Sequence, residues 1–263
     1  MPNGTADGAK WVEVTPERLA GWLDSFAQRH GHVAISPGPD VVICRAADGA
    51  VAECHVPFPP LSEAAAAESG VAARPGDAGE QAGPGDAGEQ AGPGDAGEQA
   101  GPGGGIAATA ERISAHARSD RTVAVLLVRL GGYAAGVFTG PDAQLAASKV
   151  GSRLVHGRSA AGGTSQQRFA RRREKQARQA LGAAADTAAA VFAPFTGKLD
   201  AVVLGGDRRA TAGLRDDPRL KPYFDLAVER FLSVPDPRLA VLRGTPRLFR
   251  AIRIRLTEPA QPG

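Results

Sequence analysis

Residues 122–139 read TVAVLLVRLGGYAAGVFT, and this stretch decides the fold. It contains two apolar runs, and the longest apolar run of the chain, Val123 to Val128, lies in the first of them. The pair Gly131-Gly132 separates the runs, and two glycines between apolar segments are typical of a tight β-hairpin. The sequence therefore predicts a sheet that begins with antiparallel strands.

Downstream of this hairpin, strands and helices alternate. Gly205-Gly206-Asp207-Arg208 form a turn after a strand, and a short helix follows. The remaining expected elements are a strand over 148–156, a long helix over 165–192, a strand over 199–204, a helix over 222–232 and strands near 239–242 and 249–256. Three antiparallel strands followed by this alternation predict an α/β (α+β) fold, a mixed sheet covered by helices in a ribonuclease-H-like layout.

Upstream, residues 11–60 form a small αββ piece. Thr15-Pro16-Glu17 begins a helix, because Thr caps a helix and Pro suits its first turn, and this helix ends near His30-Gly31. Segments 41–45 and 51–56 flank Asp48-Gly49 and predict a β-hairpin that carries Cys44 and Cys54, a reduced thiol pair on paired strands. Because such a piece is marginal alone, we expect it to pack on the main domain.

The segment between these parts is of low complexity. The unit PGDAGEQAG is repeated from Pro75, Pro84 and Pro93, and residues 64–105 contain almost no large apolar side chain. Such a segment cannot bury enough surface to offset the entropy of ordering it. The sequence thus predicts a disordered N-terminus (1–10), the αββ piece (11–60), a disordered acidic linker (61–105), a main domain (106–258) and a tail (259–263).

Charge is distributed unevenly along the chain. Residues 1–105 carry 5 Lys and Arg against 15 Asp and Glu, whereas residues 106–263 carry 26 against 13. A basic main domain favours a polyanionic partner, with nucleic acid first, because neutralising phosphates drives most non-specific nucleic-acid binding. The polar N-terminus has no apolar signal region and no apolar run could cross a bilayer, so we expect a cytoplasmic protein without membrane contact.

The most specific motif is AGGTSQQRFARRR at residues 161–173. Gly162 and Gly163 permit a close approach of the backbone to a ligand, and Thr164 or Ser165 can cap the helix that follows. This helix carries a basic stripe at spacings of three and four, with Glu174 as the nearby acid: Arg168, Arg171, Arg172, Lys175 and Arg178. The stripe suits a phosphate backbone. The alternative is an ordinary Gly-rich loop before a surface helix.

Gly163-Thr164-Ser165-Gln166 resembles the Gly-x-x-Gln signature of the release-factor-like domain in ribosome quality-control hydrolases of the Vms type. The strings 149–153, 162–176 and 205–208 are similar to the actinobacterial branch of that family, over residues 11–60 and 106–258. The resemblance implies a fold like the catalytic domain of eukaryotic release factors, whose Gly-Gly-Gln loop differs by lacking the Thr164-Ser165 insertion. It also implies binding to peptidyl-tRNA on the large ribosomal subunit. We expect a monomer with no cofactor and no metal.

The activity implied is hydrolysis of the ester between a nascent peptide and tRNA, with Gln166 as the catalytic residue and Gly162, Gly163, Thr164 and Ser165 shaping its loop. A Gln amide does not titrate, so Gln166 cannot be a general base. It can orient water, or stabilise the developing oxyanion together with its backbone N–H. The 2′-hydroxyl of the terminal adenosine and the ribosome would then supply the proton path.

Several other readings of the residues are weaker or stay open. Gly205-Gly206-Asp207-Arg208 could cradle a phosphate, although a strand-to-helix turn is the simpler interpretation. His30, His32, Cys54 and His55 lack zinc-site spacing, and His156 and Arg158 are candidate tRNA contacts. A metal-dependent nuclease would need carboxylates on the central strands, which have none. A metal-free endonuclease at the tRNA acceptor end and a non-catalytic ribosome-binding factor remain alternatives.

Overall fold

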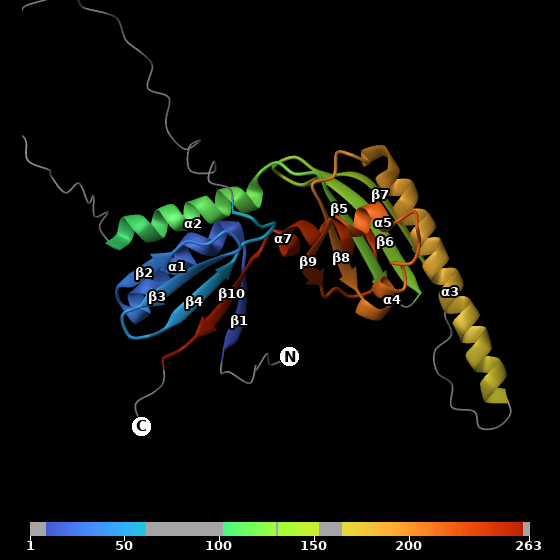
Figure 1. Cartoon of the computed structure of the whole chain (residues 1–263), viewed down its shortest axis with the longest axis horizontal. Helices are drawn as coiled ribbons and strands as arrows, with labels where there is room; N and C mark the ends of the chain where they lie inside the picture. Colours follow the sequence, from blue (N-terminus) through green and yellow to red (C-terminus); the bar gives the residue numbers. More distant parts are fainter. Residues whose placement is uncertain (1–8, 62–101, 130, 153–164, 260–263) are drawn as a thin grey trace, which may run out of the picture.

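The computed structural model describes residues 9–61, 102–129, 131–152 and 165–259, which form two lobes, each built on one five-stranded sheet (Figure 1). The first lobe comprises β1 (Lys10–Val14), α1 (Pro16–His30), β2 (Val33–Ser36), β3 (Val41–Ala46), β4 (Val51–His55), α2 (Pro102–Arg118) and β10 (Ile252–Thr257). Its sheet has the order β1-β10-β4-β3-β2, and every neighbouring pair is antiparallel.

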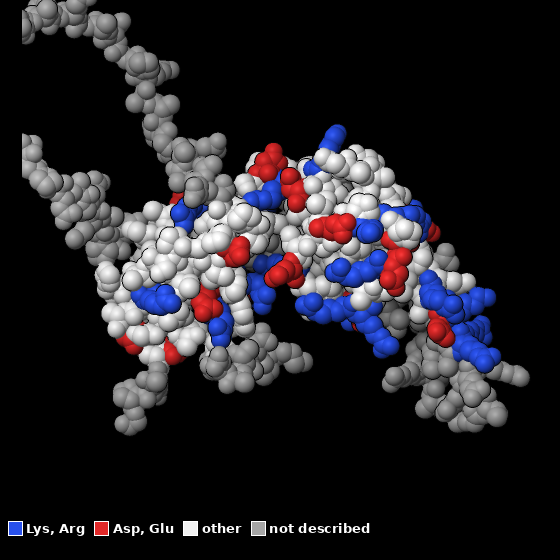
Figure 2. Space-filling view, in the orientation of Figure 1, with Lys and Arg blue, Asp and Glu red and all other residues white. Residues whose placement is uncertain are grey.

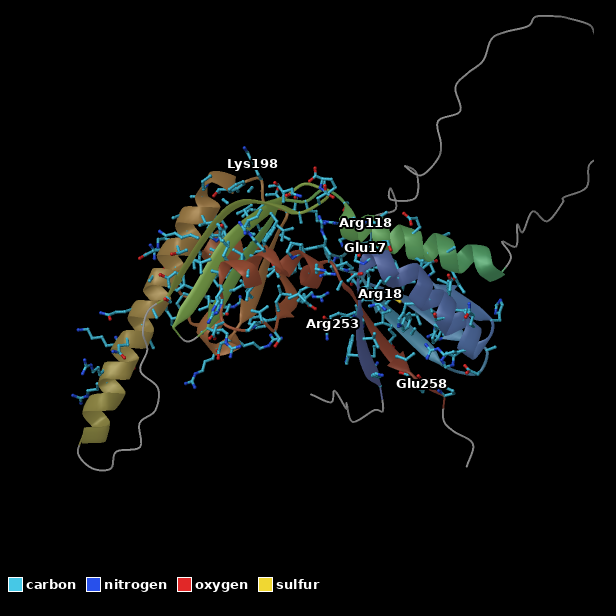
Figure 3. The ribbon with its side chains drawn as sticks, turned by 180° about the vertical axis from the view of Figure 1, so that it is seen from behind. Glu17, Arg18, Arg118, Lys198, Arg253 and Glu258 are labelled. Carbon is cyan, nitrogen blue, oxygen red and sulfur yellow. The ribbon has the colours of Figure 1, made fainter. Side chains whose placement is uncertain are left out.

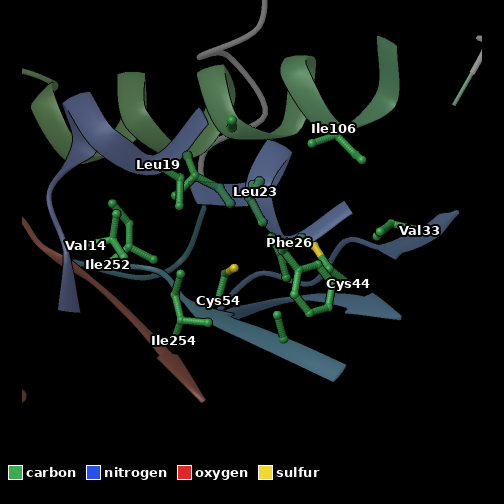
Figure 4. Packing of buried hydrophobic residues seen from close by; sticks show 14 of the residues in the cluster. Val14, Leu19, Leu23, Phe26, Val33, Cys44, Cys54, Ile106, Ile252 and Ile254 are labelled. Atoms are coloured by element: carbon green, nitrogen blue, oxygen red, sulfur yellow. The ribbon is translucent and has the colours of Figure 1, made fainter. Parts of the chain in front are cut away.

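Helices α1 and α2 cover one face of this first sheet (Figure 1). Along α1, Leu19, Leu23 and Phe26 recur at helical spacing and are almost completely buried, and Ile106 of α2 packs on the same core (Figure 4). Ile113 of α2 is also buried in this core. Both cysteines are free and buried in this core, Cys44 on β3 and Cys54 on the neighbouring β4. The predicted thiol pair on paired strands is therefore confirmed.

The second lobe contains β5 (Val123–Arg129), β6 (Gly132–Thr139), β7 (Gln144–Ser152), α3 (Ser165–Phe192), a 3-10 turn (Ala193–Phe195), β8 (Ala201–Gly206), α4 (Arg208–Ala212), α5 (Lys221–Phe224), β9 (Ala227–Leu232), α6 (Leu239–Arg243) and α7 (Thr245–Phe249). Its sheet has the order β7-β6-β5-β8-β9, antiparallel from β5 to β7 and parallel from β5 through β8 to β9. This is the mixed, ribonuclease-H-like sheet predicted from the sequence.

Strand β5 runs through the middle of the second lobe and is buried on both faces. Leu126 and Val128 face the cluster beneath α3, whereas Val125 and Leu127 face the cluster that contains Leu242 of α6 and Phe249 of α7. Because both faces of the strand are covered, all of its positions from 123 to 128 are apolar and buried. The apolar run Val123 to Val128 is thus the centre of the second lobe.

Aromatic and charged contacts join the lobes. The ring of Phe249 lies 5.8 Å from that of Phe58 in the first lobe and 5.8 Å from that of Phe138 in the second. Arg230 of β9 contacts Glu13 of β1 at 3.2 Å. Arg253 of β10, labelled in Figure 3, lies beside this junction with its guanidinium 4.4 Å from the ring centre of Trp11.

Some elements differ from those predicted. The expected helix over 222–232 is the single-turn α5 followed by strand β9, which pairs with β8, and the expected strand at 239–242 is α6. Strand β7 begins at Gln144 rather than 148, and residues 153–156 lie outside the described part. The αββ piece is extended by β1, α2 and β10, and α2 begins at Pro102, within the range assigned to the linker. Of the helices in the described part, none combines membrane-spanning length with a sufficiently apolar composition.

The predicted linker suggests a test of stability. Deleting residues 70–100, which leaves α2 intact, is expected to change the melting temperature by no more than a few degrees. The deleted residues contain no large apolar side chain except Val71, and the free energy of closing a loop depends only logarithmically on its length. Ile113→Ala is the contrasting variant: Ile113 is fully buried, so its truncation should cost about 2–5 kcal/mol. Thermal unfolding of both variants measures these changes. A large drop in the melting temperature of the deletion variant would show that the repeat packs on the fold.

Stability is also expected to depend on pH through His116. This side chain is 2% exposed, and its burial, together with the nearby Arg121 guanidinium, lowers the pKa of His116 below its ordinary value. The imidazole therefore binds a proton less readily in the folded protein than in the unfolded chain, where protonation sets in as the pH falls toward about 6.5. The melting temperature should drop between pH 7.5 and 5.5. His116→Gln should flatten that slope, and His32→Gln, at an exposed position, should not.

Candidate functional site

Helix α3 forms an arm that projects from the second lobe (Figure 1). Its C-terminal half is anchored, since Ala184, Ala188 and Phe192 are buried against the sheet. Toward the N-terminus, Ala180 is the first buried residue among its described side chains. Fifteen residues separate Ala180 from Ser165, so at 1.5 Å per residue the arm reaches roughly 22 Å beyond its anchored part.

The predicted catalytic residue lies at the tip of this arm. Gln166 is the second residue of α3, and Ser165 is the first. Gly162, Gly163 and Thr164 lie outside the described residues, as do the side chains of Ser165, Gln166 and Arg168. The structure thus places the backbone of Gln166 at the start of the projecting helix, and the geometry of the loop remains a prediction.

Four residues of the predicted basic stripe are exposed on the arm: Arg171, Arg172, Lys175 and Arg178. None of the four forms an ion pair with another residue of the described ranges, and Glu174 is exposed beside them. In Figure 2, Lys and Arg gather on the projecting part of α3 and again along the lower edge of the second lobe. Uncompensated guanidinium and ammonium groups on a projecting helix are suited to bind a phosphate backbone.

The turn after β8 is packed into the fold. Gly206 has a φ of +98°, and a Cβ there would lie 2.2 Å from the carbonyl oxygen of Val128. The Asp207 N–H donates to that same oxygen at 2.7 Å, and Asp207 Oδ1 accepts from the N–H of Ala210 at 2.8 Å as the N-cap of α4. These groups are engaged within the chain, which favours the strand-to-helix turn over a phosphate cradle.

The remaining candidates are not brought together as a site. His30 Nδ1 lies 2.8 Å from Asp48 Oδ2, while His55 lies on β4 against Trp11, with ring centres 5.0 Å apart. Within the described ranges, no group of three or more His, Cys, Asp or Glu residues could hold a metal ion. His156 and Arg158 lie outside the described residues.

A mixed sheet that carries a long basic helix, with a Gly-x-x-Gln motif at the start of that helix, defines a release-factor-like protein. Residues 121–255 match the model of a family described as Actinobacteria/chloroflexi VLRF1 release factor, and the chain belongs to that family. The description of this family names a release factor, which indicates a translation-related role.

Comparison with solved structures adds two similar proteins. A crystal structure of the archaeal translation termination factor aRF1 is 14% identical over 49% of this chain and 36% of its own, with a TM-score of 0.37. A structure titled only as an archaeal protein is 15% identical over 46% of this chain and 32% of its own, with a TM-score of 0.33. The chain therefore spans about a third of the length of either protein. No curated protein sequence matches it.

Proposed function

We propose that this protein is a peptidyl-tRNA hydrolase that releases nascent peptides from tRNA on stalled ribosomal complexes. One observation carries the proposal: the Gly-x-x-Gln motif ends at the first turn of a helix that extends roughly 22 Å beyond its anchored part. Such an arm can carry Gln166 into a narrow site while the two lobes stay outside. The substrate would be the ester on the 3′-terminal adenosine, held in the large subunit in the cytoplasm.

The electrostatics of the arm support this substrate. Arg171, Arg172, Lys175 and Arg178 are exposed along the helix behind the motif, so they would follow Gln166 into a channel walled by ribosomal or transfer RNA. Contacts to phosphates position a protein on RNA without reading its sequence. We infer that the stripe orients the arm and that Gln166 acts at its end.

The chemical role assigned to Gln166 is positional. Its amide does not exchange protons near neutral pH, so it would hold the attacking water or donate to the oxygen that becomes negative in the transition state. Gly162 and Gly163 would let the backbone approach the ester closely. The acid and base steps are assigned to the tRNA 2′-hydroxyl and to the ribosome.

The nature of the product tests the proposal. Purified protein is incubated with stalled large-subunit peptidyl-tRNA complexes, and the 3′ ends of the released tRNA are sequenced. Ester hydrolysis leaves the terminal adenosine in place, whereas an endonuclease at the acceptor end removes nucleotides. Intact ends together with free peptide are expected. Shortened ends would establish the metal-free endonuclease instead, and bound but uncleaved peptidyl-tRNA would establish a non-catalytic ribosome-binding factor.

A further inference from the structure

A pocket of about 430 Å³ lies at the foot of the arm, between α3, the end of β5 and the start of α4. Ala177, Ala180 and Leu181 of α3 form one wall, and Val128 and Ala210 contribute the facing side. This volume lies within the range of small-ligand sites, and the walls are largely apolar. The pocket therefore has room for a flat organic group rather than for an ion alone.

An aromatic ring lines this pocket and is held in place by a glycine. Tyr133 of β6 pairs with Gly151 of β7, and a Cβ at position 151 would lie 2.5 Å from the Tyr133 ring. The ring therefore lies directly over the β7 backbone, in a position that any larger residue at 151 would block. Aromatic side chains at such positions stack on nucleic-acid bases in RNA-binding proteins.

The polar groups of the pocket match a nucleotide. Asp207 Oδ1 caps α4, while its Oδ2 has no hydrogen bond to another described residue and can accept one from a ligand. Arg209 lines the pocket, is exposed and forms no ion pair within the described ranges. Arg129 also lines the pocket, and its Nη1 donates a hydrogen bond to the carbonyl oxygen of Val234 at 2.8 Å. Arg178, one residue beyond Ala177, adds a further cation on the arm.

We propose that this pocket binds one unpaired nucleotide of an RNA strand, with the base against Tyr133 and the phosphates on Arg209 and the arm. Asp207 would accept a hydrogen bond from an exocyclic amino group, which cytosine, adenine and guanine carry and uracil lacks. An apolar protein side chain is the less suitable occupant, because it would leave the Asp207 carboxylate and the Arg209 guanidinium without partners. The proposal goes beyond peptide release, since it concerns binding alone and does not require Gln166.

The test measures the affinity of the full-length protein for fluorescently labelled single-stranded hexamers of cytidine, adenosine and uridine. The wild-type protein should bind the cytidine and adenosine hexamers about tenfold more tightly than the uridine hexamer. Tyr133→Leu should weaken binding of the first two by about tenfold, because it removes the stacking surface. Asp207→Asn keeps a side chain that can cap α4 and should reduce the preference over uridine.

Matched variants separate the pocket from the rest of the surface. Gly151→Ala, which displaces the ring of an unchanged Tyr133, should weaken binding of the cytidine and adenosine hexamers, whereas Gly182→Ala, in open space on α3, should not. Arg209→Ala should weaken binding of every hexamer, and Arg243→Ala, at an exposed position on α6, should leave it unchanged. Equal affinities for all hexamers, or affinities that Tyr133→Leu and Asp207→Asn leave unaltered, would overturn the proposal. Peptide release can succeed or fail independently of either result.

Discussion

Replacing Gln166 by Ala is expected to slow peptide release by about 10²-fold or more while leaving the fold intact. This is the scale of the loss when one preorganised oxyanion-stabilising donor is removed. Stability should be unaffected, because Gln166 lies at the tip of the arm, well before Ala180, where the described burial of α3 begins. Single-turnover release from stalled large-subunit peptidyl-tRNA, at matched occupancy, measures the effect.

Two further variants define the role of this side chain. Gln166→Glu keeps the shape but places a carboxylate beside the developing negative charge, so it should be no better than Gln166→Ala. Gln167 is the matched control, because successive residues of an α-helix point about 100° apart and Gln167 therefore faces elsewhere. Wild-type release by Gln166→Ala would remove the central claim. A loss confined to Gln167→Ala would move the site by one residue.

The elements with a strong local signal could be predicted from the sequence. The bounds of α3 are those expected, 165–192, because its apolar positions recur on one face over many turns. Helix α2 shows the same periodicity in Ile106, Ala110, Ile113 and Ala117, all buried, but its Pro-Gly-Gly-Gly beginning looks like the end of the linker. Because the start of α2 has the composition of the linker, the sequence did not predict this helix.

The two wrong assignments, a helix over 222–232 and a strand near 239–242, both fall on short apolar segments. Residues 227–232 and 239–243 each contain a run that fits either a helix or a strand, and tertiary position decided between them. Val202 and Leu204 of β8 offered a parallel partner to the first segment, whereas the second ends at Gly244 and packs as α6. The pairing of β10 with β1 and β4 could not be predicted either, because the apolar pattern of a strand does not show which strands lie beside it.

In the candidate site, too, one feature could be predicted from the sequence and another could not. The basic stripe follows from spacing along one helix, and the exposed positions of Arg171 and Lys175 agree with that spacing. The pocket at the foot of the arm could not be predicted, because Tyr133, Leu181 and Ala210 come from three elements far apart in the sequence. In the sequence, only the Gly205-Gly206-Asp207-Arg208 turn points to this region, and its glycines predict a backbone turn rather than a pocket.

Reversing the charge of the arm is expected to have the second large effect. Changing Arg171, Arg172 and Lys175 together to Glu should weaken binding to the large-subunit complex and make the salt dependence of the binding constant shallower. Each phosphate contact contributes about 0.7–0.9 to the slope of log K against log salt, so three lost contacts should reduce it by about 2–3. The fold should be unaffected, because these exposed side chains form no ion pair with a described residue. Equilibrium binding at several salt concentrations measures both quantities.

A charge-matched control distinguishes direct contact from long-range attraction. Lys10, Arg18 and Arg45 are exposed on the first lobe, and changing them to Glu alters the net charge by the same amount as the arm variant. A protein that binds through the arm should tolerate this control at moderate salt, where charges more than about 10 Å from the RNA are screened. Equal losses in both variants would mean that overall charge, rather than the stripe, drives association.

The arm variant should also separate binding from chemistry. Phosphate contacts position a protein and carry no base information, so once the concentration of the arm variant is raised until the complexes are saturated, its release rate should approach that of the wild-type protein. Gln166→Ala should show the opposite behaviour, with normal binding and a slow rate at saturation. The two defects would then multiply in a combined variant, because independent steps contribute additively to the free energy. A slow rate at saturation in the arm variant would instead show that the stripe takes part in forming the reactive geometry at the tip.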